Sequence, residues 1–315
     1  MLRIQRSRLA VWSALAALSL LFAGVGAVKA GAARAATTSP VSGTSSAKAT
    51  PSCKLIVNFH QRNFSKSAKI SNRWLPLVPG TQFILDGKAN WGNGLRPHRV
   101  VFIITDLTKV INGVRTVVIW ERDFNAGQLV ESELAFHAQD NKKNVWLFGE
   151  YPESYENGKF TGAPDTWIAG TAKSKAGIIM RAKPRVGTPS YLQGLAPAIG
   201  FVDCAKVIKT GQKVCTPHRC YRNALVTDEW NPLVPEDGHQ QKYYVRGIGN
   251  VRAGFVGGPE HEILTLTKTV RLCTKAVAEV REEALKLDRR AYRVSKDLYR
   301  HTRPAEHTLR ARTCR

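Results

Sequence analysis

The sequence lacks the short local motifs on which most enzyme and cofactor sites are built. It has no Gly-x-Ser-x-Gly elbow and no glycine-rich phosphate loop. The segment 247–250 (Gly-Ile-Gly-Asn) is similar to the first half of a dinucleotide motif, but no helix is expected after it, so it indicates a turn. No two histidines stand four residues apart, as they do in helical zinc sites. From these motifs we expect no catalytic residue, no cofactor and no metal site.

Acidic residues are also scarce. The chain has 24 Asp and Glu against 47 Lys and Arg, a formal net charge of +23. An expected leader at 1–36 contains five of the basic residues and no acidic one, so the mature chain keeps about +18. A field of this size attracts polyanions, with an affinity that salt lowers. Solubility is the alternative reason for such a charge, and no motif points to specific nucleic-acid binding.

The first 36 residues are typical of a secretory signal peptide. Arg3, Arg6 and Arg8 precede an apolar run from 9 to 28, and small-residue cleavage patterns follow. No cysteine is placed to accept a lipid. An uncleaved membrane anchor remains an alternative, because about 20 apolar residues can span a bilayer. Residues 37–52 are rich in Ser, Thr, Ala and Gly, and we interpret them as a flexible linker. The chain is therefore expected outside the cytoplasm, secreted or associated with the cell envelope.

Six cysteines follow this leader, and an even count in an exported chain predicts disulfides. They are Cys53, Cys204, Cys215, Cys220, Cys273 and Cys314. Their spacing leaves all fifteen pairings open. A glycine turn at 210–212 favours a local bridge between two of Cys204, Cys215 and Cys220, and Cys53 and Cys314 are interpreted as staples for the chain ends. Cys215, His218 and Cys220 could also bind zinc, but the spacing is unusual for a zinc site and a disulfide is favoured.

Residues 53–270 predict a mainly β domain. Short apolar, β-branched runs alternate with turn signals, the pattern of antiparallel strands. Asn112-Gly113 lies between two such runs and is a strong hairpin signal. We expect a curved antiparallel meander sheet or an open barrel, followed by a long C-terminal α-helix. The less regular segment from 151 to 189 would cap or line the sheet.

The period of the sequence changes at residues 271–303, which predict a basic amphipathic helix before a tail at 304–315. Apolar residues from Val270 to Leu298 are spaced by three and four. This seam could dock on the protein's own body, giving a monomer, or pair between chains as a coiled coil. Basic residues cluster toward the end of the helix and would contact an anionic envelope polymer or a membrane surface. These residues are Arg289, Arg290, Arg293, Lys296 and Arg300.

Several ordered phrases in the sequence resemble a family of exported bacterial proteins with no established activity. The resemblance covers about 60% of the chain, from Asn72 to about Gly258. The phrases are NRWLPLVPGT from residue 72, TKVINGV from 108, AQDNKKNVWLFGE from 138, YENGK from 155, GIIM from 177 and KYYVRGIGNVR from 242. This chain departs from the family at the Cys215 and Cys220 pair and in its basic helical tail. The resemblance implies export and carries no catalytic residue over.

Two further groups of residues could form a site. Glu121, Asp123, Glu131 and Glu133 lie on adjacent expected strands, so carboxylates could pair across the ladder for acid–base chemistry, near His137. The alternative is that they form the solvent face of a hairpin. Trp120, Trp146, Trp167 and Met180 would line an apolar ligand cavity if the sheet encloses one.

Together these features favour an exported, non-enzymatic binding or envelope-associated module that holds an apolar ligand. The alternatives are a hydrolase of envelope polymers that uses the carboxylate hairpin, and a structural protein that oligomerises through its C-terminal helix.

Overall fold

The computed structural model describes residues 53–315 except 91, 93, 260, 312–313 and 315. The expected signal peptide at 1–36 and linker at 37–52 therefore lie outside the described residues. Within the described part, no helix is both long and apolar enough to cross a bilayer.

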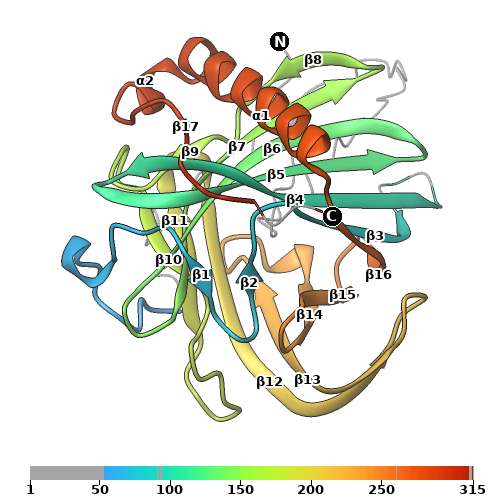
Figure 1. Ribbon diagram of the computed structural model, residues 1–315. Coiled ribbons are helices and arrows are strands. Elements are labelled where there is room, and N and C mark those ends of the chain that lie inside the picture. The colour runs from blue at the N-terminus through green and yellow to red at the C-terminus, as the bar shows by residue number, and fades with distance from the viewer. Residues whose placement is uncertain (1–52, 91, 93, 260, 312–313, 315) are drawn as a thin grey trace, which may run out of the picture.

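The main body is a closed antiparallel barrel of twelve strands (Figure 1). The first five are β3 (Thr81–Asn90), β4 (Leu95–Ile111), β5 (Val114–Asn125), β6 (Gln128–Gln139) and β7 (Val145–Glu156). The other seven are β10 (Lys175–Met180), β11 (Tyr191–Ala196), β12 (Phe201–Cys215), β13 (Cys220–Trp230), β14 (His239–Val245), β15 (Gly249–Val256) and β16 (Ile263–Arg271). The barrel closes because β16 pairs with β3 and β10 pairs with β7. The expectation of a mainly β fold with a C-terminal helix is confirmed.

Short elements lie around this barrel. Strands β8 (Lys159–Gly162) and β9 (Trp167–Ile168) pair with β7, and β17 (Glu306–His307) pairs with β4. Strands β1 (Ile70–Ser71) and β2 (Pro76–Leu77) form a separate two-stranded sheet. Three 3₁₀ turns are η1 (Gln61–Asn63), η2 (Pro197–Ile199) and η3 (Pro235–Asp237).

The hairpin predicted at Asn112-Gly113 is confirmed. Ile111 of β4 pairs directly with Val114 of β5 across a two-residue turn. Both turn residues have positive φ, 46° at Asn112 and 74° at Gly113, which the type I′ hairpin turn requires and which Asn and Gly tolerate best. This hairpin sets the register in which β5 faces β4 and β6.

The turn predicted at 210–212 is wrong, because β12 runs on to Cys215 and the chain reverses at 216–219. Gly211 has a positive φ of 71°, and the register of β12 against β13 shifts around it. The glycine therefore accommodates an irregularity within the strand rather than a reversal. The segment from 151 to 189 also differs from expectation, since it contributes β10, which closes the barrel.

The C-terminal segment forms helix α1 (Thr274–Val294) and a single turn, α2 (Lys296–Tyr299), with a break at Ser295. Figure 1 shows α1 lying across the outside of the barrel. The predicted apolar seam packs on the barrel, because Val277, Ala284 and Leu287 are buried within the main core cluster. This is the docking on the protein's own body that was one of the two alternatives.

All six cysteines are paired in disulfides. The bridges are Cys53–Cys204, Cys215–Cys220 and Cys273–Cys314. The predicted local bridge is thus Cys215–Cys220, which joins the end of β12 to the start of β13. The two long-range bridges fasten the described N-terminal end to β12 and the C-terminal end to the start of α1, as expected for Cys53 and Cys314.

Candidate functional site

The outer side of the C-terminal helices carries a row of exposed basic side chains. We call Arg289, Arg293, Lys296 and Arg300 the basic face. All four are exposed, two on α1 and two on or directly after α2. Arg300 lies 3.9 Å from Asp297, but both side chains are mostly exposed, so this pair neutralises little charge. Arg289, Arg293 and Lys296 make no ion pair with any described residue.

Arg290, the fifth residue predicted for this contact, is placed differently. Its guanidinium donates hydrogen bonds of 2.6 Å to Glu153 and 3.1 Å to the Tyr155 hydroxyl, and it lies over the ring of Phe160. Glu153 is fully buried. Arg290 therefore holds α1 against β7, whereas the four residues of the basic face are exposed.

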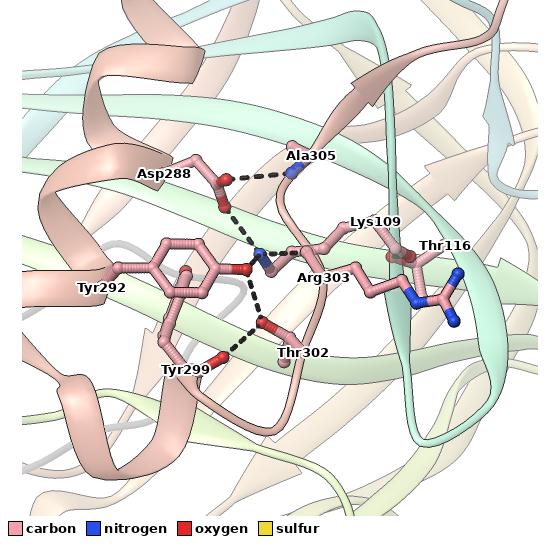
Figure 2. Close-up of polar contacts among 8 residues, drawn as sticks. All are labelled: Lys109, Thr116, Asp288, Tyr292, Tyr299, Thr302, Arg303 and Ala305. Atoms are coloured by element: carbon pink, nitrogen blue, oxygen red, sulfur yellow. Dashed lines mark hydrogen bonds and ion pairs between the residues drawn. The ribbon is translucent and has the colours of Figure 1, made fainter.

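A buried lysine fixes the position of the basic face. The Lys109 ammonium on β4 is fully buried and donates to Asp288 (2.8 Å), to the Tyr292 hydroxyl (3.0 Å) and to the Arg303 carbonyl (2.8 Å), as Figure 2 shows. The second Asp288 oxygen accepts the Ala305 amide (2.9 Å). One ammonium thus connects the barrel, α1 and the segment after α2.

A second ion pair holds the first half of α1. The Arg281 guanidinium forms a bidentate contact with Asp106, a carboxylate almost fully buried on β4. The hydrogen bonds to Asp106 have the largest effect on the pKa of Arg281 and raise it. Burial acts in the opposite direction but is the smaller effect. The roles of Lys109, Asp106 and Asp288 could not be predicted from the sequence, because a single charged residue gives no sign of its distant partner.

The four carboxylates of the β5–β6 hairpin face the barrel interior, so their interpretation as a solvent face is wrong. Glu121 pairs directly with Glu133, and Asp123 with Glu131. Each is at most 5% exposed. On β5 they alternate with Trp120 and with Arg122, which is attracted to Glu283 of α1 on the outside. Period-two alternation therefore points the carboxylates inward.

Burial and mutual repulsion change the protonation of these groups. Burial, followed by the charges of Glu133 and Glu131, raises the pKa of Glu121 well above its usual range. Burial also raises the pKa of Asp123 to about 7, although His98 opposes the shift. Burial alone would lower the pKa of His98, but Asp123 and Glu262 raise it overall. Burial thus favours the protonated form of Glu121 and Asp123.

The acidic interior extends around the barrel. Asp203 on β12 and Glu229 on β13 lie close enough to influence each other, and burial followed by the charge of Glu229 raises the pKa of Asp203. The Lys242 ammonium lies 2.7 Å from Glu229. The Tyr191 hydroxyl is fully buried and has no hydrogen-bond partner among the described residues. In this conformation a polymer chain cannot reach these groups, since all of them are almost completely covered.

The predicted ligand-binding residues are buried, and each of the three indoles has its own hydrogen-bond partner. Each indole donates a hydrogen bond inside the protein: Trp120 to Ser132 (2.9 Å), Trp146 to Asp140 (3.0 Å) and Trp167 to Glu150 (2.8 Å). Trp146 packs edge-on against Phe59 and Phe64 of the N-terminal segment. Met180 is fully buried on β10. Trp167 also lines a small pocket of about 220 Å³ beside the break between α1 and α2.

Metal ligation has no support within the described residues. No group of three or more His, Cys, Asp or Glu side chains there is arranged to hold a metal ion. Cys215 and Cys220 are joined in a disulfide, so they offer no thiolate to zinc.

The chain is weakly similar to two solved structures of bacterial proteins. No family model and no curated protein matches the chain. A candidate lipoprotein from Parabacteroides distasonis aligns with 13% identity and a TM-score of 0.38, over 63% of this chain and 99% of its own. A candidate exported protein with a YmcC-like fold from Bacteroides fragilis aligns with 12% identity and a TM-score of 0.34, over 64% of this chain and 100% of its own. Similarity at this level says nothing about what this chain binds, and the family resemblance stays a prediction.

Proposed function

We propose that the protein is an extracytoplasmic binding module that attaches to an anionic polymer of the cell envelope through its basic face. The observation that carries this proposal is that the basic residues in and around the C-terminal helices fall into two groups, one paired and one exposed. Lys109, Arg281 and Arg290 are paired with buried carboxylates. The basic face is exposed and keeps its charge available for a partner.

Rigidity supports this role. The Lys109 contacts, the Arg281–Asp106 pair and the Cys273–Cys314 bridge fix α1 on the barrel. The basic side chains are thus held on a surface that is ordered before binding, which reduces the entropy lost on association. The net positive charge of the whole chain adds long-range attraction toward a polyanion.

A polymer fits this surface better than a lipid bilayer. Helices that bind the membrane interface bury a broad apolar face among the lipids. The apolar face of α1 is already packed on the barrel, and Val294, 40% exposed, is the large apolar residue left open on this helix. Sulfate, phosphate or carboxylate groups along a polysaccharide would meet the four cations without any apolar insertion.

Binding to immobilised dextran sulfate, with neutral dextran as the control polymer, tests the proposal. The test variant carries Arg289→Gln, Arg293→Gln, Lys296→Gln and Arg300→Gln. A matched control carries Lys206→Gln, Lys209→Gln, Lys213→Gln and Arg222→Gln, which removes equal charge from exposed positions of the β12–β13 hairpin, on the opposite side of the molecule from α1 in Figure 1.

We expect the test variant to lose at least tenfold in affinity for dextran sulfate and the control variant to stay within about threefold of the wild-type protein. Equal losses in the two variants would contradict the proposal, because they would mean that net charge alone governs binding. Stronger binding to anionic lipid vesicles than to dextran sulfate would assign the basic face to a membrane instead.

A further inference from the structure

The outer face of the barrel carries a groove that the basic face does not include. Its volume is about 610 Å³, and it lies over β3, β4 and β5. Its lining includes the charged side chains of Asp86, Arg99 and Arg122 and the apolar side chains of Val101 and Phe124. This volume falls within the range of about 300–1,000 Å³ that is typical of small-molecule sites.

Arg122 is the distinctive residue of this groove. Its guanidinium lies 4.5 Å from the ring centroid of Trp120 and 5.9 Å from that of Phe124. Its Nε atom is buried and has no hydrogen-bond partner among the described residues. A guanidinium normally uses its planar set of donors on a carboxylate or phosphate. The Arg122 guanidinium lines the groove and donates no hydrogen bond to a described residue, so it can receive an anion that enters there.

The charge around Arg122 is not balanced by its neighbours. Burial lowers the pKa of Arg122, and the attraction of Glu283 only partly offsets this effect. Glu283 itself pairs with Lys286 at 2.7 Å. A partly buried cation in this position is stabilised when an anion enters beside it.

The other charged or titratable groups of the groove already have partners. His98, which also lines it, lies 3.2 Å from Asp123 and 2.8 Å from Glu262. Asp86 accepts a hydrogen bond of 2.6 Å from Arg99 and one of 2.5 Å from the Thr267 hydroxyl. Burial opposes ionisation of Asp86, but these contacts lower its pKa overall, so it stays ionised and neutralises Arg99. Arg122 is therefore the cation left for a ligand, and Val101 and Phe124 provide an apolar wall next to it.

We infer that this groove binds a small organic anion with an apolar or aromatic body, whose carboxylate, phosphate or sulfonate contacts Arg122 while its body packs on Val101 and Phe124. This site is independent of the polymer-binding proposal, because it shares no residue with the basic face.

Two fluorescent probes of matched shape test this site. Anilinonaphthalene sulfonate carries an anionic group, and N-phenylnaphthylamine has the same aromatic body without it. The wild-type protein should bind the sulfonate at least tenfold more tightly than the neutral amine. Energy transfer from tryptophan to the probe should accompany binding. It should be weaker in Trp120→Phe, because Trp120 contacts Arg122 and is the donor beside the groove. Equal affinity for the two probes, or transfer that is unchanged in Trp120→Phe, would overturn the inference.

Substitutions separate the groove from unspecific binding. Arg122→Gln should lower the affinity for the sulfonate at least tenfold and leave the affinity for the neutral amine within about twofold. Arg252→Gln is the matched control, because Arg252 also lies over an aromatic ring, that of Tyr243, and has a buried Nε atom with no described partner. It should leave both affinities unchanged, and an equal loss in this variant would overturn the inference.

Val101→Trp keeps the test decisive if Arg122→Gln fails to fold. The larger side chain should fill the groove and lower binding of the sulfonate at least fivefold, with an unchanged near-ultraviolet circular dichroism spectrum outside the tryptophan bands. Unchanged binding in a folded Val101→Trp variant would place the probe elsewhere and overturn the inference.

Discussion

Glu121 links the stability of the barrel to pH. Its pKa is raised by burial and by neighbouring carboxylates, so the folded protein keeps this proton where the unfolded chain releases it, above a pKa of about 4.3. The unfolded state then binds fewer protons than the folded state, and the contribution of Glu121 to stability falls as the pH rises. His137 acts in the opposite direction, since burial lowers its pKa to about 3 and its contribution falls as the pH drops below about 6.5.

We predict that Glu121→Gln stabilises the protein at pH 7.5 by about 2 kcal/mol, because the amide keeps the shape and removes an acid that cannot ionise without cost. The gain should be smaller at pH 4.5. Urea unfolding of the wild-type protein and the variant at both pH values measures this gain. His137 is present in both proteins, so its effect cancels when their free energies of unfolding are subtracted. The exposed Glu156→Gln is the control and should change stability by less than about 0.5 kcal/mol. A gain that does not depend on pH would contradict the account.

Lys109 is the residue on which the position of α1 depends most. Burial lowers the pKa of Lys109 overall, although Asp288 opposes this shift. Replacing it leaves the almost fully buried Asp288 carboxylate without its cation. We predict that Lys109→Met destabilises the protein by about 3–5 kcal/mol in urea unfolding. Adding Asp288→Leu should recover part of this loss. A double variant less stable than the single one would show that the pair is not coupled in this way.

At the scale of elements, the three disulfides should differ in their contribution. Their cysteines are separated by 151, 41 and 5 residues for Cys53–Cys204, Cys273–Cys314 and Cys215–Cys220. Chain-entropy arguments give about 5, 4 and 2 kcal/mol for loops of these lengths. We predict that replacing each pair by alanine lowers the melting temperature in that order. A Cys215–Cys220 deletion as costly as that of Cys53–Cys204 would contradict this order.

Elements defined by local sequence could be predicted, and those defined by distant partners could not. Asn112-Gly113 identified its hairpin because its backbone preference is local. Gly211 was predicted to form a turn, but it lies within β12. A glycine with positive φ occurs at irregular positions of a strand as well as in turns. The break at Ser295 was missed, since the apolar spacing continues through it to Leu298.

At the scale of the whole molecule, alternation showed that Glu121 and Asp123 share a face but not which face. Solvent is the usual place for four carboxylates, and only closure of the barrel by the β7–β10 pairing puts them inside. That pairing is between strands far apart in sequence and leaves no local signal. Of the five residues predicted for the polyanion contact, four are exposed and form the basic face, because the outer side of a helix follows from its period. The fifth, Arg290, pairs with Glu153, a distant partner that the period does not reveal.

The molecule that results has an acidic interior, a basic exterior and two C-terminal helices that carry exposed cations. We propose that these cations form the contact with an anionic polymer. The most direct measurement is the salt dependence of binding to dextran sulfate, for the wild-type protein and for the variant with all four basic-face residues changed to Gln. We predict that the slope of log K against log salt is shallower in the variant by roughly 3, as expected when four ion pairs to a polyelectrolyte are lost. Identical slopes would contradict the claim, because they would show that the basic face releases no counterions on binding.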